Sequence, residues 1–184
     1  GEMTQVPSLA IDDDLIAELL SVHDKIGRRN NASYVSMVQS RSLGKDLFSS
    51  LASALLTLGG LHAPILQTYH FLSSFRTNEE IQGHVESELT AMRKIPGWGS
   101  SFEKGQPDPE FKILDEMLSG SPIHCRMHYV SGLLHGSGIQ IYPNASCYTC
   151  AVCISKDLPV AIAQYFLVNG RLNAWTSAYL SGAS

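Results

Sequence analysis

Apolar residues recur at the spacing of an α-helix along most of this 184-residue chain, and this periodicity constrains the fold more than any other feature. The clearest stripe consists of leucines about one helical turn apart: Leu47, Leu51, Leu55 and Leu58. The Gly59-Gly60 pair that follows is typical of a helix end, because glycine readily adopts the left-handed backbone found there. Such stripes bury one face of each helix, so the pattern predicts helices packed on one another.

Further stripes predict a series of helices with short connections. They cover residues 15–20, 65–72, 81–92, 111–118 and 123–134. Three short helices are expected near the C-terminus, at about residues 146–154, 159–168 and 170–181. Residues 139–142 form the one segment whose pattern favours a β-strand. The expected fold class is therefore all-α and multi-helical.

Composition narrows the class of protein. Apolar residues make up 44% of the sequence and charged residues 16%, which excludes a long disordered chain. The net charge of -4 and the isoelectric point of about 5.9 argue against a nucleic-acid partner. The sequence shows neither an apolar stretch of membrane-spanning length nor a signal peptide, so we expect no membrane contact and a cytoplasmic location with reduced cysteines.

Residues 95–109 form a segment too long and too rich in glycine and proline to be a simple connector. It reads Ile95-Pro-Gly-Trp-Gly-Ser-Ser-Phe-Glu-Lys-Gly-Gln-Pro-Asp-Pro109. Loops of this length are often functional, and this one could wrap a ligand with its backbone amides. A structured surface loop is the competing interpretation.

A run of cysteines raises the question of a metal site. Cys147, Cys150 and Cys153 form a C-x2-C-x2-C pattern, and upstream lie His124, Cys125, His128 and His135. These residue types suit zinc or an iron–sulfur cluster. The run lies in apolar, helix-like sequence without the turn glycines of a zinc knuckle, so buried structural cysteines are expected. A Cys-rich metal-binding module is kept as an alternative.

Three segments, taken in order, resemble the citrate synthase superfamily, which includes citryl-CoA lyases and the citrate-synthase-like module of ATP-citrate lyase. The first runs from Asn31-Ala-Ser33 through a helix over residues 44–59 to His62, and is similar to the family's Asn-Ala-Ser stretch, long helix and Gly-x-x-His turn. The second, residues 95–109, resembles the family's Pro-Gly-aromatic-Gly-His loop. The third, Tyr142-Pro-Asn-Ala-Ser-Cys-Tyr148, resembles the segment that carries a catalytic aspartate, and Gly170-Arg171-x3-Trp175 looks like a late helix of the family.

The resemblance implies a citrate-synthase-like core that corresponds to the C-terminal half of a full member. Residues 1–10, in which Gly1 and Glu2 precede Met3, are interpreted as a tag remnant and flexible N-terminus. Residues 11–184 would form the helical domain, with about 95–145 resembling the family's small-domain part.

The resemblance also implies roles for particular residues. His62 matches the histidine that hydrogen-bonds the acyl-CoA carbonyl, although its position alone, between two helices, favours a helix-capping or surface role. Arg171 matches an arginine that binds a substrate carboxylate. Cofactor-binding roles are implied for residues of the second segment: Pro96, Gly97, Trp98, Gly99 and Lys104.

Several of the family's catalytic side chains are replaced. Ser100 stands where a second histidine polarises the keto acid, and Ser146 stands where an aspartate removes a proton. Glu110 replaces an arginine that holds a substrate carboxylate, and Arg28 or Arg29 lies where a substrate-binding histidine is expected. A serine hydroxyl is not a base near neutral pH, and the loss of a catalytic base costs a factor of about 10²–10⁴ in rate.

We therefore expect a citrate-synthase-like protein that lacks most catalytic residues and has a binding, regulatory or scaffolding role. Residues 47–58 and 65–75 are apolar enough to form a homodimer interface, as the resemblance implies. The first alternative is a residual acyl-CoA or citryl-CoA lyase or synthase-type enzyme, or a CoA-thioester binder, with CoA or an acyl-CoA as its cofactor and a small carboxylate as a further ligand. The second alternative is the cysteine-rich metal module. Outside that module no metal site is expected.

Overall fold

The computed structural model describes residues 13–58, 63–99 and 104–182, and within these ranges the chain is helical with no β-strand. The helices are α1 (Asp14–Gly27), α2 (Ala32–Ser42), α3 (Leu47–Leu55), α4 (Ile65–Ser74), α5 (Asn78–Thr90), a short 3₁₀ helix η1 (Pro109–Phe111), α6 (Lys112–Leu118), α7 (Pro122–Gly136), α8 (Ala145–Ser155) and α9 (Val160–Ser181). The all-α prediction is confirmed. The interpretation of residues 1–10 falls outside the described ranges.

Two details of the predicted pattern are wrong. Residues 139–142 are not a strand, because none of the residues that the structure describes pairs with them as a strand; the bridge beside them joins Trp98 to Pro143. The two helices expected at 159–168 and 170–181 form one continuous helix, α9. Gly170 does not interrupt it, because this glycine lies at a close helix crossing where a side chain would not fit.

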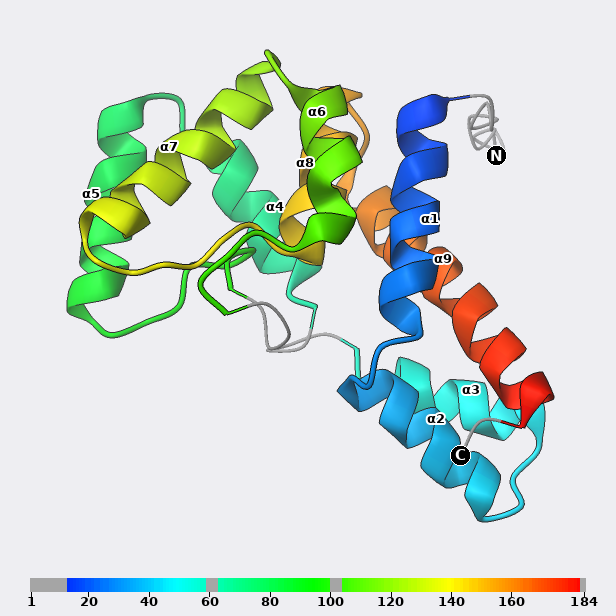
Figure 1. Ribbon diagram of the computed structural model, residues 1–184. Coiled ribbons are helices and arrows are strands. Elements are labelled where there is room, and N and C mark those ends of the chain that lie inside the picture. The colour runs from blue at the N-terminus through cyan, green and yellow to red at the C-terminus, as the bar shows by residue number, and fades with distance from the viewer. Residues whose placement is uncertain (1–12, 59–62, 100–103, 183–184) are drawn as a thin grey trace, which may run out of the picture.

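At that crossing the first helix, α1, packs against the last helix, α9. A Cβ atom on Gly170 would lie 2.4 Å from the Cβ of His23 and 3.1 Å from the carbonyl oxygen of Leu20. A Cβ on Gly27 would lie 2.8 Å from that of Ala174. The two glycines therefore let the backbones of α1 and α9 approach closely, and Figure 1 shows the two helices side by side.

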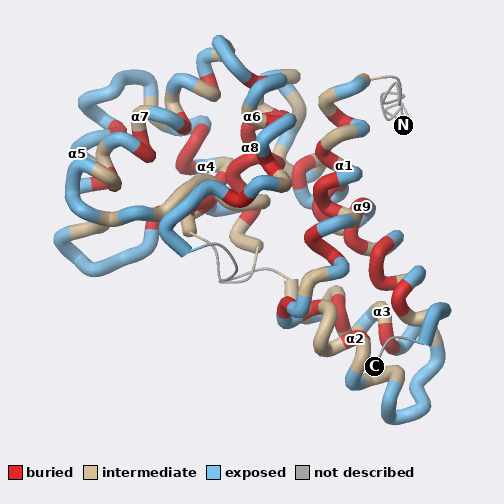
Figure 2. The backbone as a smooth tube through the Cα atoms, in the orientation of Figure 1, coloured by how far each residue is buried: buried red, intermediate tan, exposed pale blue. Residues whose placement is uncertain are grey.

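The helices form two packed groups that α9 joins. In Figure 1, α4 to α8 form one group that contacts one end of α9 through α4 and α8, and α2 and α3 pack against its other end. The smaller group has its own apolar cluster, which includes Met37, Ala54 and Trp175. The larger group is centred on α8, in which every residue from Ser146 to Cys153 is buried (Figure 2).

Asparagine side chains begin two of these helices. Asn31 caps α2 by accepting a hydrogen bond from the backbone N–H of Tyr34. Asn144 caps α8 through the N–H groups of Ser146 and Cys147. Both Asn-Ala-Ser sequences are therefore helix starts, which places each serine in a first turn. None of the helices in the described ranges has both the length and the apolar character needed to cross a membrane.

Candidate functional site

The second and third sequence motifs meet at the N-terminus of α8. The backbone N–H of Gly99 donates to the carbonyl oxygen of Tyr142 at 2.8 Å. The backbone N–H of Asn144 donates to the carbonyl oxygen of Gly97 at 2.9 Å, and its side-chain amide donates to that of Gly99 at 3.0 Å. These bonds hold the loop that begins at residue 95 beside the start of α8.

The motif glycine and tryptophan of this loop have structural contacts. Gly97 has a φ of 88°, and a Cβ there would lie 2.6 Å from Cγ2 of Thr68, so only glycine fits. Trp98 is buried, and its indole N–H donates to the hydroxyl of Ser131 at 3.0 Å. Pro96 and Gly99 are half-buried and Lys104 is exposed. Cofactor binding by these residues stays a prediction.

Ser146 lies in the first turn of α8, where the resemblance places the catalytic aspartate. Its side chain is buried, with the residue 3% exposed. Its backbone N–H is bound by the side chain of Asn144. Within residues 13–58, 63–99 and 104–182, no carboxylate or imidazole is hydrogen-bonded to its hydroxyl. The residues that the structure describes therefore supply no hydrogen-bonded base to this hydroxyl.

A buried polar cluster lies one turn further along α8. The Nε2 atom of His23 lies 2.7 Å from the hydroxyl oxygen of Thr149, and both residues are fully buried. The Thr149 hydroxyl also donates to the carbonyl oxygen of Ala145 at 2.6 Å. Since the hydroxyl proton is used in that bond, Nε2 of His23 is the donor to Thr149, and Nδ1 carries the lone pair.

Arg171 completes this cluster from α9. Burial and, to a smaller extent, the positive charge of Arg171 lower the pKa of His23 to about 3, so the imidazole is neutral at physiological pH. Arg171 is only 4% exposed, and burial lowers its pKa to about 10, which leaves the guanidinium charged. Its Nε and Nη1 atoms, like Nδ1 of His23, are buried without a hydrogen-bond partner in the part of the chain that the structure describes.

Two ion pairs connect the region of α1 to the region of η1. One runs from Arg29, just after α1, to Asp108, which caps η1, and the other from Lys25 in α1 to Glu110 in η1. Arg29 binds both carboxylate oxygens of Asp108, with Nη1–Oδ2 and Nη2–Oδ1 distances of 2.5 and 2.9 Å. Lys25 lies 3.3 Å from Glu110, the residue that stands in place of the family's arginine. Burial alone would raise the pKa of Asp108, but hydrogen bonds from Arg29 and from the Glu110 amide hold it below its usual value.

The structure thus brings some of the predicted site residues together. Gly97 approaches α8 beside Cys147. Ser146 and Thr149 lie on the same face of the first turns of α8. Thr149 is bonded to His23, which in turn lies near the charge of Arg171. His62 and Ser100 lie outside the described residues. Sequence reasoning did not bring His23 and Thr149 together, because they are 126 positions apart in the chain and no single motif contains both.

The three clustered cysteines do not form a set of metal ligands. Cys147, Cys150 and Cys153 are all buried in α8, and burial raises the pKa of each thiol, that of Cys153 to about 12. Among the residues that the structure describes, the atoms that do gather as possible ligands belong instead to Asp115, His124 and His128.

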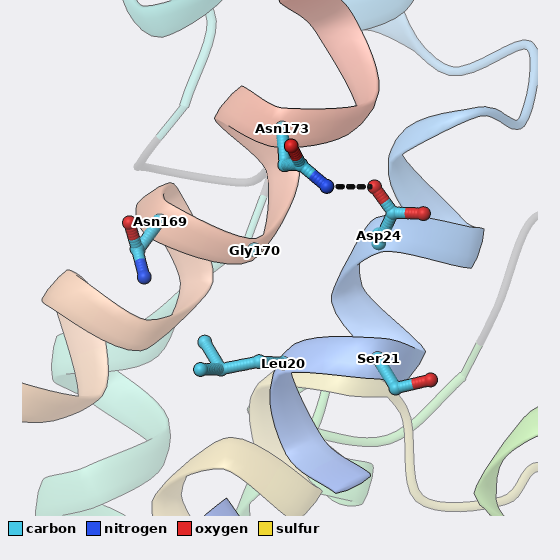
Figure 3. Close-up of a pocket in the computed structure, with 6 residues that line it drawn as sticks. All are labelled: Leu20, Ser21, Asp24, Asn169, Gly170 and Asn173. Atoms are coloured by element: carbon cyan, nitrogen blue, oxygen red, sulfur yellow. Dashed lines mark hydrogen bonds between the residues drawn. The ribbon is translucent and has the colours of Figure 1, made fainter. Parts of the chain in front are cut away.

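Two cavities lie near these elements. The first, of about 590 Å³, is lined by residues from the loop before η1, by α6 and α7, and by the start of α8. The second, of about 530 Å³, lies between α1 and α9, where Asn173 donates to Asp24 at 3.1 Å (Figure 3). It contains none of the predicted site residues, and its polar lining residues are Ser21, Asp24, Asn169 and Asn173.

Several solved structures share this fold, among them those of three enzymes. The citrate synthase of Thermotoga maritima MSB8 has a TM-score of 0.77 at 22% sequence identity, over 92% of this chain and 49% of that one. For citryl-CoA lyase from Hydrogenobacter thermophilus the TM-score is 0.71 at 19% identity, over 94% and 71% of the two chains. For ATP citrate lyase from Methanothrix soehngenii the TM-score is 0.74 at 17% sequence identity, over 92% of this chain and 31% of that one.

These similarities establish a citrate-synthase-like fold, as the sequence motifs predicted. The chain spans 49% of the length of the citrate synthase, so the match covers a part of that protein. No protein-family model and no curated protein sequence matches the chain.

Proposed function

We propose that this protein uses a citrate-synthase-like fold to bind a small carboxylate, as a homodimer, without making or breaking carbon–carbon bonds. The observation that carries the proposal is Ser146, which is buried at the start of α8 and has no base hydrogen-bonded to its hydroxyl among the described residues. Proton removal from an acyl carbon needs a group that is basic near neutral pH, and a serine hydroxyl is not.

The acidic residues near Arg29 support the loss of that chemistry. The resemblance places substrate-binding groups near Arg29 and at position 110, but here Arg29 is bound to Asp108, and Glu110 pairs with Lys25. A carboxylate ligand at this place would have to displace internal ion pairs and approach two negative charges. That arrangement disfavours a tricarboxylate held in the family's manner.

Arg171 supports the binding role. A buried guanidinium is costly unless an anion and hydrogen-bond acceptors compensate its charge. The described residues give no acceptor to Nε and Nη1 of Arg171, and the adjacent His23 is neutral. A small carboxylate offers two oxygens that match the fork of a guanidinium. Arg171 is therefore the group that would hold the ligand.

The surface of α3 supports the dimer. Leu51, Leu55 and Leu58 of the leucine stripe pack inward against the smaller apolar cluster. On the opposite side, Phe48, Ala52 and Leu56 lie one turn apart and are exposed, with Phe48 at 81% and Leu56 at 87%. An exposed apolar stripe at helical spacing is typical of an interface, and a symmetric dimer would cover it with its own copy.

Calorimetric titration tests the binding role. The ATP citrate lyase above was solved with citrate and coenzyme A, so citrate and coenzyme A, together with oxaloacetate, are the probes. We expect a carboxylate to bind the wild type and to bind Arg171→Met at least tenfold more weakly. Arg76→Met, which removes an exposed guanidinium from a different surface, is the matched control and should bind as the wild type does. Equal binding by the wild type and Arg171→Met, or no heat with any carboxylate at millimolar concentration, would refute the proposal.

A further inference from the structure

Two histidines and one carboxylate converge between α6 and α7. His124 and His128 lie one turn apart on α7, and their Nε2 atoms are 3.0 Å apart. Oδ2 of Asp115, on α6, lies 3.3 Å from Nε2 of His124 and 3.8 Å from that of His128. We propose that these three residues form a binding site for a divalent transition metal ion, and that Zn²⁺ is the ion it fits best.

The spacing of the three atoms matches what zinc requires. In a tetrahedral site with Zn–N and Zn–O bonds of about 2.0–2.2 Å, neighbouring ligand atoms lie about 3.3 Å apart. The observed separations of 3.0, 3.3 and 3.8 Å fall on both sides of that value. One ion can therefore contact all three atoms after small side-chain adjustments. Imidazole nitrogens with one carboxylate oxygen are a ligand set that suits Zn²⁺ and excludes Ca²⁺ and Mg²⁺, which prefer oxygen alone.

A neighbouring hydrogen bond orients the carboxylate. The hydroxyl of Tyr148 donates to Oδ1 of Asp115 at 2.8 Å, which leaves Oδ2 directed at the histidines. Tyr148 is itself fixed, because it is 6% exposed and its ring stacks on that of Phe111 at 4.7 Å between centroids. Such outer hydrogen bonds commonly orient metal ligands and strengthen binding.

The site is open on one side. The exposed fraction of the side chain rises from 13% for His124 to 35% for Asp115 and 62% for His128. Three protein ligands leave the fourth position of a tetrahedral ion for water or an exogenous ligand. Asp115 and His128 also line the cavity of about 590 Å³, together with Lys112, His135 and Tyr142, so that fourth position adjoins a space that can admit a small molecule.

This proposal is independent of the carboxylate site. Its three metal ligands belong to α6 and α7, whereas Arg171 and Ser146 belong to α9 and α8. It also differs from the cysteine-rich metal module, since the thiols of α8 are not among the ligands. Either proposal can fail without the other.

Zinc titration of the full chain, after treatment with a chelator and its removal, tests the site. Every protein carries Cys125→Ser, because the exposed thiol of Cys125 on α7 could otherwise bind zinc. We expect one zinc ion per chain, with affinity lowered about 10- to 100-fold by Tyr148→Phe and by a larger factor by His124→Ala or His128→Ala, which remove a ligand. His70→Ala, which removes an exposed histidine from α4, is the control and should leave the affinity unchanged.

Two further measurements distinguish the loss of the metal site from misfolding of a variant. Circular dichroism establishes whether each variant is folded, and His128→Gln is the milder replacement at the most exposed position. Co²⁺ bound at the site should give the intense visible absorption of a four-coordinate ion, and this absorption should be absent from His128→Gln. No zinc binding at millimolar metal, or equal binding by the wild type and the folded histidine variants, would overturn the proposal.

Discussion

Arg29 holds Asp108 through two hydrogen bonds across 79 positions of the chain. The pair joins the connection between α1 and α2 to the loop before η1. Asp108 is 7% exposed, and the Arg29 side chain is 21% exposed, so both charges have lost much of their hydration. Removal of one charge from such a pair leaves the other without compensation.

We expect Asp108→Asn to lower the free energy of unfolding by about 2–3 kcal/mol. The amide keeps an oxygen that can accept the hydrogen bond from the N–H of Glu110, so the change isolates the charge. Glu116→Gln is the matched control, because its partner Lys112 lies 4.0 Å away and both side chains are largely exposed. The control should change stability by less than about 0.5 kcal/mol in urea unfolding. Equal effects of the two substitutions would show that the Arg29–Asp108 pair contributes no more than a surface pair.

The buried His23 should make stability depend on pH. Its pKa is about 3 in the folded protein, against an ordinary value of 6.5, so between these values the unfolded chain binds a proton that the folded chain does not. Stability contributed by the neutral imidazole is complete above about pH 6.5 and is lost as the pH falls. Between pH 7 and pH 5 this loss amounts to about 2 kcal/mol.

Urea unfolding of His23→Gln at both pH values measures this contribution. Glutamine can still donate to the Thr149 hydroxyl but does not titrate, so the variant should lose about 2 kcal/mol less than the wild type over the same pH change. His70→Gln, at an exposed position on α4, should retain the wild-type dependence. A His23→Gln variant with the wild-type slope would contradict the buried neutral imidazole.

The close approach of α1 and α9 predicts that alanine at Gly170 destabilises the protein, whereas alanine at a helical glycine with free space around it should stabilise it. Gly170→Ala should destabilise the protein by about 1–3 kcal/mol, because the added methyl group would overlap His23. Gly132→Ala on α7 meets no atom within 4 Å and should stabilise by about 0.5–1 kcal/mol through helix propensity. Thermal unfolding of both variants checks this pair of signs. A neutral or stabilising Gly170→Ala would mean that the two helices are further apart than described.

The exposed face of α3 predicts the oligomeric state. Size-exclusion chromatography with light scattering should give the mass of a dimer at low micromolar concentration, and Phe48→Asp should give a monomer, because a charge would be buried in the interface. Met92→Asp, at an equally exposed apolar residue just after α5, is the control and should remain dimeric. A wild type that is monomeric at these concentrations would exclude the dimer.

Local periodicity was enough to predict the helices, because the residues that form each stripe are near one another in sequence. It failed where tertiary contacts decide the outcome. Residues 139–142 have the composition of a strand but no neighbouring strand, and Gly170 has the appearance of a helix break but serves a helix crossing. In both cases the outcome depends on which distant part of the chain does or does not pack there.

The same limit applies to the candidate sites. The motifs around Gly97 and Ser146 could be recognised from short patterns, and the structure places both at the start of α8. The bond between His23 and Thr149 could not be predicted, since each residue is unremarkable in its own helix. Asp115 belongs with His124 and His128 only because α6 packs against α7. The sequence pattern grouped the two histidines with the cysteines and did not point to Asp115.

The most direct test of the central claim is a turnover assay. The wild-type protein is incubated with acetyl-CoA and oxaloacetate, and separately with citryl-CoA, while free coenzyme A is measured in the first case and acetyl-CoA in the second. We predict rates equal to those of the same mixtures without protein, because Ser146 supplies no base. Turnover that rises with protein concentration, saturates with substrate and is lost in His62→Ala would contradict this account.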